Sequence, residues 1–151
     1  MSCHWLENVY WISQIGLVII AAVAACVAYN QLSASNKFEL LKVLETQNVR
    51  QARQFLFRKL HGPHDPPENW WVHDDKLEEA ASTICASFDI VALMAFKKNR
   101  QFFAKKWAHP ICWTYRDLAP YIQARNPSGY QDYHKLYQEA EHYDSSASTI
   151  T

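Results

Sequence analysis

The apolar positions of this chain fall into two patterns. From residue 9 to residue 31 the sequence is almost continuously apolar and contains no charged residue. As a helix rising about 1.5 Å per residue, this segment is long enough to cross a hydrocarbon core of roughly 30 Å. Aromatic residues at both of its ends are typical of a membrane–water interface. The pattern predicts one transmembrane helix over 9–31.

After residue 31 the apolar residues recur every three or four positions, which predicts amphipathic helices. The chain has only three glycines, which favours long helical stretches, and the predicted fold class is all-α. Asn36 with Glu39 is typical of a helix N-terminus, although the sequence between the apolar segment and Asn36 also allows one unbroken helix. Either helix is expected to end at His61-Gly62-Pro63.

Three further helices are predicted from capping signals and apolar stripes. Asp75 and Glu78 open the most regular stripe, which ends near residue 95. A stripe from residue 103 to residue 122 predicts the next helix, which Pro110 is expected to kink or split. Ser128 with Gln131 predicts a capping box for the last helix.

The predicted organisation is one membrane helix followed by one compact domain. We expect a short extracytoplasmic N-terminus at 1–8, the transmembrane helix at 9–31, a cytosolic bundle of about four helices at 32–144, and a disordered tail at 145–151. At 151 residues the chain has room for a single modest domain besides the span.

Flanking charge predicts the orientation of the membrane helix. No Lys or Arg precedes the apolar segment, whereas the stretch 31–63 holds six basic and two acidic residues. The positive-inside rule then places the N-terminus outside and the bundle in the cytosol. A secretory signal peptide would require a basic start that is missing. Val23-Ala24-Ala25-Cys26 resembles a lipoprotein processing box, an alternative in which Cys26 becomes a lipidated N-terminus.

Composition and residue spacing argue against several kinds of binding site. The formal net charge is zero, so no overall field attracts nucleic acid. The four cysteines are scattered and form no C-x-x-C pair, which argues against a zinc site or a disulfide framework and suits a reducing compartment. The His- and Asp-rich loop around His61, His64 and Asp65 has no spacing of a known metal site. No metal and no cofactor is expected.

Small residues in the apolar segment suggest that it associates with copies of itself. Helices approach closely in lipid where small residues lie four apart, and the candidate interface residues are Gly16, Ala21, Ala24, Ala25 and Ala28. The alternative is a simple anchor. If copies form a ring, Gln14 is a candidate to line a pore, with Ile19 and Val23 as an apolar constriction; otherwise Gln14 is hydrated at the outer interface.

Two groups of residues in the domain are candidates for function. A basic run interleaved with aromatic residues could bind the phosphates of RNA or a nucleotide, or anionic lipid, or form a solvated helix start; its members are Lys97, Lys98, Arg100, Lys105 and Lys106. Arg58 and His64 have the loose spacing used by helical ribonucleases for phosphate contact and proton transfer. Gly62-Pro63 between them interrupts the helix that would hold both on one face.

The layout resembles a known group of proteins. A single N-terminal span leads into a basic helix, followed by Ala86-Ser87-Phe88-Asp89 and the stretch 113–125. This arrangement is similar to a bacterial family of small single-span proteins and to the membrane accessory proteins of Cas13b-type CRISPR systems. The resemblance implies a homo-oligomer around a membrane pore, a HEPN-like cytosolic fold and a role in antiviral defence. If the arginine–histidine pair carries over, Arg58 and His64 are the matching positions.

The predicted function is therefore that of a non-enzymatic, homo-oligomeric inner-membrane protein that forms a pore or perturbs the membrane. Its expected partners are the lipid bilayer, further copies of itself, and a CRISPR effector or an RNA or nucleotide signal. Two alternatives stay open, namely a membrane-anchored HEPN-like RNase and a membrane-tethered module that binds RNA or nucleotides.

Overall fold

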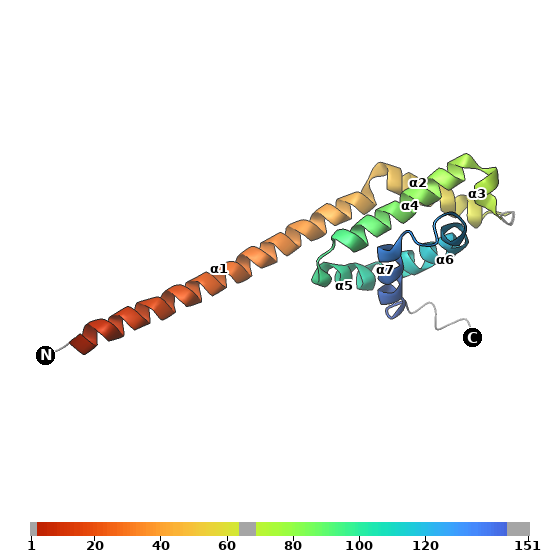
Figure 1. Cartoon of the computed structure of the whole chain (residues 1–151). Coiled ribbons are helices and arrows are strands. Elements are labelled where there is room, and N and C mark those ends of the chain that lie inside the picture. The colour runs from red at the N-terminus through yellow and green to blue at the C-terminus, as the bar shows by residue number, and fades with distance from the viewer. Residues whose placement is uncertain (1–2, 64–68, 145–151) are drawn as a thin grey trace. The chain divides into compact units, whose positions relative to one another are not determined.

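The computed structural model describes residues 3–63 and 69–144, and helices are its only regular elements over those ranges. The predicted all-α class is confirmed. The helices are α1 (Cys3–Glu45), α2 (Gln47–Leu60), α3 (Trp70–His73), α4 (Asp75–Met94), α5 (Lys97–Lys106), α6 (Ala108–Arg125) and α7 (Gln131–Glu141) (Figure 1). The chain divides into two compact units, Met1–Ser35 and Asn36–Thr151. The predicted tail at 145–151 lies outside the described residues.

The first unit consists of helix α1 up to Ser35. Within residues 13–45 of α1, an apolar window with few charged residues has a mean hydropathy of 2.0, and none of that window is buried inside the protein. This is one helix that is long and apolar enough to cross a membrane.

The second unit begins within the same helix and is built around a single core. Helix α1 runs through residues 30–36 without interruption, as the unbroken alternative predicts, but it ends at Glu45 and not at His61-Gly62-Pro63, so the expectation of one helix up to that point is wrong. Asn36 therefore caps no helix. Leu40 and Leu44 on this last part of α1 are buried in the core of the second unit.

A break between α1 and α2 has no glycine or proline to cause it. Helix α1 ends at Glu45, and Thr46 has extended ψ. Thr46 Oγ1 donates a hydrogen bond to the carbonyl oxygen of Val43 at 3.0 Å, and Arg53 Nη2 donates one to the carbonyl oxygen of Leu44 at 2.8 Å. These side chains satisfy carbonyl groups that a helix end leaves without partners. Helix α2 then ends at Leu60, where the sequence predicts it.

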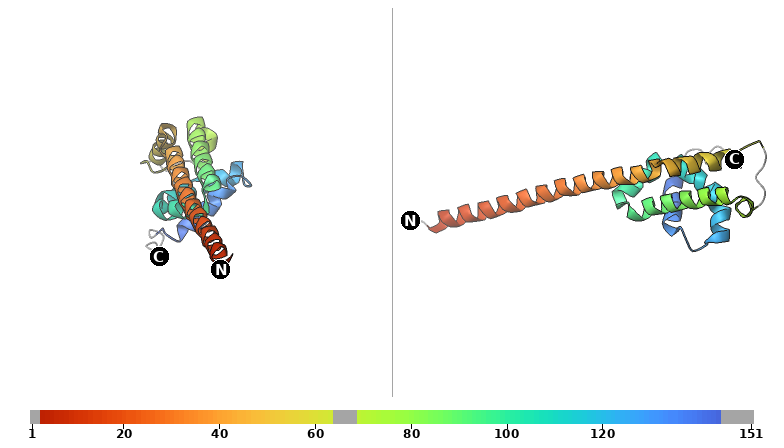
Figure 2. Two further views of the ribbon diagram at one scale, coloured as in Figure 1. Left: turned by 90° about the vertical axis from the view of Figure 1, so that its left-hand side faces the viewer. Right: turned by 90° about the horizontal axis from the view of Figure 1, so that it is seen from above.

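Helix α4 is the centre of the second unit. Its N-cap is Asp74, one residue before the predicted signal, and Asp74 Oδ1 accepts hydrogen bonds from the backbone N–H groups of Lys76 and Leu77 at 3.1 Å. One side of the helix is fully buried, as the apolar stripe predicts; its buried residues are Leu77, Ala80, Ala81, Ile84, Cys85, Ser87, Phe88, Val91 and Ala92. Helix α2 packs along α4, and the two lie side by side in each view of Figures 1 and 2.

The stripe from residue 103 to 122 belongs to two helices. The split is at Trp107, between α5 and α6, and Pro110 lies in the first turn of α6. Proline is tolerated there because the first turn has no intrahelical partner for a backbone N–H group. The predicted split is confirmed, three residues earlier than Pro110. Pro120 lies inside α6, and its exposed side chain leaves the buried face of that helix intact.

The capping box predicted for the last helix is wrong. Helix α7 begins at Gln131, and the residue before it, Tyr130, has a left-handed backbone with φ of 54°. Gln131 Nε2 donates to the carbonyl oxygen of Ser128 at 3.1 Å, so the pair closes a turn outside the helix. The cap comes from another helix, because Asp89 Oδ1 on α4 accepts from the backbone N–H of Tyr133 at 2.9 Å.

Helix α7 packs against α4, α5 and α6, which joins the second half of the domain to the first. The Tyr133 ring is fully buried and stacks on Phe88, with ring centroids 4.9 Å apart. The domain thus holds more helices than the four expected, because the third predicted helix is two and α3 is an additional single turn.

Candidate membrane helix and polar surface of the bundle

The apolar side chains of the first unit are exposed throughout the part that the structure describes. The large side chains among them are each about half exposed or more; they are Tyr10, Trp11, Ile15, Leu17, Val18, Ile19, Ile20, Val23, Val27, Tyr29 and Leu32. A water-soluble protein rarely exposes so continuous an apolar surface. A lipid environment or apolar partners would bury it.

Helical geometry sorts the candidate residues of this segment into two faces. At about 100° per residue around the helix axis, four residues point within roughly 40° of their common mean direction, namely Gln14, Ala21, Ala25 and Ala28. We call this set the alanine face. Ala24 lies beside it. Gly16, Ile19 and Val23 point to the opposite side.

These two faces separate candidate residues that were expected to share one surface. Gln14 cannot share one pore-lining face with Ile19 and Val23, because the straight run of α1 places them on opposite sides. Gly16 likewise cannot share a contact with Ala21 and Ala25. Gln14 instead shares a face with the alanines, where a side-chain amide could bond across two packed helices.

Of the two residues proposed as a ribonuclease pair, Arg58 and His64, the structure describes only Arg58. Arg58 lies exposed on the last turns of α2, and His64 lies outside the described residues. Gly62 is required where the chain leaves α2, because a Cβ atom there would approach the carbonyl oxygen of Arg58 to 2.8 Å. The helix ends before it could carry both residues.

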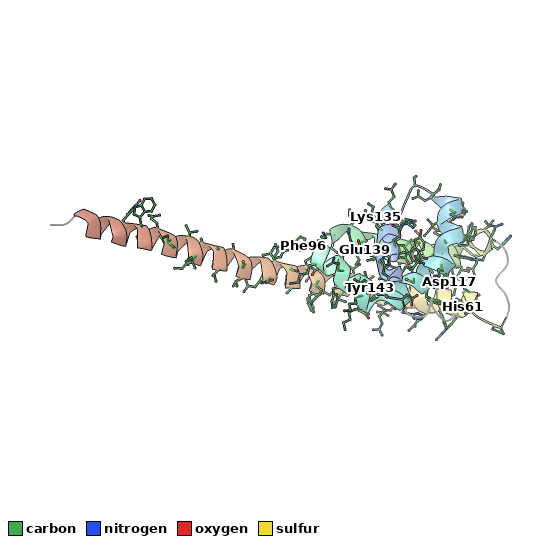
Figure 3. The ribbon with its side chains drawn as sticks, turned by 90° about the horizontal axis from the view of Figure 1, so that it is seen from below. His61, Phe96, Asp117, Lys135, Glu139 and Tyr143 are labelled. Atoms are coloured by element: carbon green, nitrogen blue, oxygen red, sulfur yellow. The ribbon has the colours of Figure 1, made fainter. Side chains whose placement is uncertain are left out.

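The structure brings together a different histidine and a carboxylate. His61 Nε2 lies 2.8 Å from Asp117 Oδ2 on α6, and both are labelled in Figure 3. The His61 ring also lies against Phe57 and Trp113, at centroid distances of 5.4 and 5.0 Å. Residues 61 and 117 are 56 positions apart and share no motif, so no local pattern predicts this pair.

A shallow hollow lies beside this aromatic group. It has a volume of about 280 Å³ and is lined by Arg50, Arg53, Gln54, Phe57 and Trp113. Arg53 is already engaged, since its guanidinium lies 5.3 Å from the Trp107 ring and bonds the Leu44 carbonyl. Burial lowers the pKa of Arg53 from its usual value, which fits a guanidinium used in packing. The hollow is open to solvent, and its Arg53 guanidinium is held by structural partners.

The basic run forms helix α5. Lys97, Lys98, Lys105 and Lys106 are exposed, whereas Arg100 Nη2 pairs with Glu139 Oε1 on α7 at 2.8 Å. Phe103 is fully buried, and the partly buried Trp107 contacts Arg53. Phe103 is therefore occupied by core packing, and Phe102 and Trp107 are partly buried beside Lys37 and Arg53, which reduces the ring surface available for stacking on bases.

No group of three or more potential metal ligands occurs among residues 3–63 and 69–144. Asp74 caps α4 and lies 3.9 Å from Lys59 Nζ, so its role there is structural. His64 and Asp65 lie outside the described ranges.

The buried cysteines are poor nucleophiles. Burial, with the nearby Asp89 carboxylate, raises the pKa of Cys85 to about 12. Burial and the adjacent Asp144 raise the pKa of Cys112 to about 11. Both thiols are therefore protonated at neutral pH, whereas a catalytic cysteine requires the thiolate.

A polar network covers the contact between α6 and α7. The hydroxyl of Tyr115 lies 2.7 Å from His134 Nδ1, and Asp144 lies 3.6 Å from both Arg116 and His109. The Asp144 side chain is only 2% exposed. Since these groups join α6 to α7 and to the residues that follow it, we assign the network to the packing of α7 on α6.

Comparison with protein-family models, with curated proteins and with solved structures finds no significant match to this chain.

Proposed function

We propose that this chain is a single-span inner-membrane protein that associates with copies of itself through its apolar helix and presents a helical bundle to the cytosol. The observation that supports the proposal most strongly is the exposure of every large apolar side chain described between Tyr10 and Leu32. Burying a side chain of this size away from water contributes about 1.5–3 kcal/mol, so a bilayer would stabilise the exposed segment strongly.

The orientation follows from the basic residues after the segment. Lys37 and Lys42 on α1, and Arg50, Arg53 and Arg58 on α2, all belong to the second unit. Positive charge is enriched on the cytosolic side of bacterial membrane helices, which supports a cytosolic bundle.

Self-association is supported by the alanine face. Without a hydrophobic driving force in lipid, helices associate by close packing and by hydrogen bonds between polar side chains. Ala21, Ala25 and Ala28 provide close packing, and Gln14 on the same face provides a polar group that can pair between two copies. Ile19 and Val23 then face either lipid or the lumen of a ring.

The proposed activity is non-enzymatic, namely conduction through, or perturbation of, the membrane by the assembled copies. The link to antiviral defence comes from the resemblance in layout.

Membrane integration is tested by carbonate extraction and by protease protection of the full chain in spheroplasts. We expect the chain to remain in the membrane pellet, with the bundle protected from protease added outside. A chain recovered in the soluble fraction, or a bundle digested from outside, would contradict the proposal.

Self-association is tested by mass measurement in nanodiscs. We expect Ala21→Leu with Ala25→Leu to reduce the oligomer, because the larger side chains keep the backbones apart. Ala22→Leu is the matched control, since it makes the same chemical change about 60° away from Ala25 around the helix. Dye release from vesicles should fall with the oligomer, and oligomers that release no dye would exclude the pore.

A further inference from the structure

The turn between α4 and α5 exposes apolar side chains at the end of a helix that is otherwise well packed. Leu93 and Met94 in the last turn of α4 are 67% and 59% exposed, and Phe96 in the turn is 36% exposed. By contrast, Val91 and Ala92 beside them are buried. We call residues 93–98 the α4–α5 corner, where Phe96 is labelled in Figure 3.

The corner also carries two exposed lysines where helix electrostatics disfavours them. Lys97 and Lys98 are the first residues of α5, whose first turn contains no acidic residue. The N-terminus of a helix carries partial positive charge, so cations there reduce the stability of the helix. Among the ion pairs of the described residues neither lysine takes part, in contrast to Arg100 one turn later, which pairs with Glu139.

Asn36 fixes the corner in place. Its Nδ2 donates to the carbonyl oxygen of Met94 at 3.2 Å, and its Oδ1 accepts from the Phe96 backbone N–H at 3.5 Å and from Asn99 Nδ2 at 2.8 Å. The buried Asn99 belongs to α5, so one side chain joins α1 to both sides of the turn.

The residue that holds the corner is close in sequence to the apolar segment. Leu32, the last large apolar residue of the first unit, precedes Asn36 by four residues, a reach of at most about 14 Å even for an extended chain. Lys37, the first charged residue after the segment, lies with its Nζ 4.7 Å from the ring of Phe102 on α5. Only a short stretch of chain therefore separates the apolar segment from the residues that contact the corner and α5.

We propose that the α4–α5 corner docks on the bilayer surface, with Leu93, Met94 and Phe96 among the upper acyl chains and Lys97 and Lys98 on the phosphates of anionic lipids. This inference rests on the proposed membrane integration and adds a second, lipid-selective contact to it. Apolar side chains bordered by lysines match such an interface, because the rings and aliphatic groups leave water while the ammonium groups meet anionic headgroups.

The test places a spin label at the corner of the full chain in nanodiscs. Cys26→Ala and Cys3→Ser remove the other reactive thiols, and Cys85 and Cys112 stay, since they are buried and protonated. A nitroxide at Leu93→Cys should be more accessible to oxygen than to a water-soluble nickel chelate in discs of phosphatidylglycerol. In discs of phosphatidylcholine that ratio should fall several-fold.

Two controls make the result specific. A label at Val72→Cys, another exposed apolar site (58% against 67% for Leu93) on α3 beyond the other end of α4, should remain accessible to water in both lipids. Lys97→Glu with Lys98→Glu should return the Leu93 label to water in phosphatidylglycerol, whereas Lys105→Glu with Lys106→Glu, at the other end of α5, should not. The first pair places acidic residues at a helix N-terminus, which favours folding, so unfolding does not explain the loss.

The outcomes separate this inference from the function on which it rests. A chain that enters the discs but keeps the Leu93 label in water overturns the docked corner alone. An equal effect of the two lysine pairs overturns the role of Lys97 and Lys98. A chain that fails to enter the discs overturns both proposals.

Discussion

The two units of this chain use the same residue types in opposite ways. Ala81, Ala104 and Ala140 in the bundle are fully buried, where a small side chain lets neighbouring helices come close. Ala21 and Ala25 in the first unit are exposed. The comparison shows that the bundle buries these small residues between its own helices, whereas the first unit leaves its small and large apolar residues exposed.

The largest difference between the two units is expected when charge is placed on the exposed apolar helix. We expect Ile19→Arg with Val23→Arg to remove the chain from the membrane fraction, since arginine at the centre of a membrane helix costs about 2.5–3.5 kcal/mol per residue. Val72→Arg is the matched control, because Val23 and Val72 are both 58% exposed. The measurement is the share of chain in the carbonate-resistant pellet. Equal behaviour of the two variants would show that the apolar segment is not in lipid.

The bundle should instead be sensitive to the truncation of a buried apolar side chain. Phe88 is fully buried and stacks on Tyr133, so Phe88→Ala should destabilise the second unit by about 3–5 kcal/mol through the cavity it leaves. Ile90→Ala, two residues along on the exposed side of α4, should change stability much less. Thermal unfolding of the detergent-solubilised chain checks both. Membrane fractionation of Phe88→Ala should be unchanged, because the first unit is not involved.

A smaller effect is expected where one side chain joins three elements of the bundle. Asn36→Ala removes the hydrogen bonds to Met94, Phe96 and Asn99 and leaves the buried Asn99 amide without its Asn36 partner. The expected loss is about 1–3 kcal/mol. Hydrogen exchange should locate the loosening at residues 94–99. Lys42→Ala serves as the control on the same helix, since its pair with Glu39 is exposed.

The smallest effect concerns pH. Because the pKa of Cys85 rises from about 9 in the unfolded chain to about 12 in the fold, the unfolded chain loses this proton first as the pH increases. The contribution of Cys85 is therefore complete below pH 9 and is lost as the pH rises toward 12. Cys85→Ala should flatten the decline of the denaturation midpoint across that range. A decline of unchanged slope would assign it to other groups, such as the buried Tyr133, whose pKa is also raised.

Local sequence signals predicted the parts of the fold that depend on local physics. The stripe of α4, the end of α2 before Gly62 and the interruption near Pro110 each follow from spacing or from backbone chemistry that nearby residues determine. The break at Thr46 and the turn after Met94 have no such signal. They depend on Arg53 and Asn36, which reach these backbones from other positions in the chain.

The candidate sites show the same division. The exposed lysines of α5 and the apolar segment could be found from composition. The contact of His61 with Asp117 could not, because the two residues meet only after α2 and α6 pack. The aromatic residues of the basic run suggested a stacking surface for nucleic acid. The spacing that places Phe103 beside lysines, however, also places it in the core.

The cap that Asp89 provides for α7 has a consequence for biosynthesis. Helix α7 follows α4 in the chain, and the Asp89 carboxylate that accepts the Tyr133 N–H is made 44 residues before it. A nascent chain that ends before Tyr133 has the ring of Phe88 without its stacking partner. Because the Phe88 ring and the Asp89 carboxylate gain these contacts only once α7 has been made, this part of the core cannot form earlier in translation.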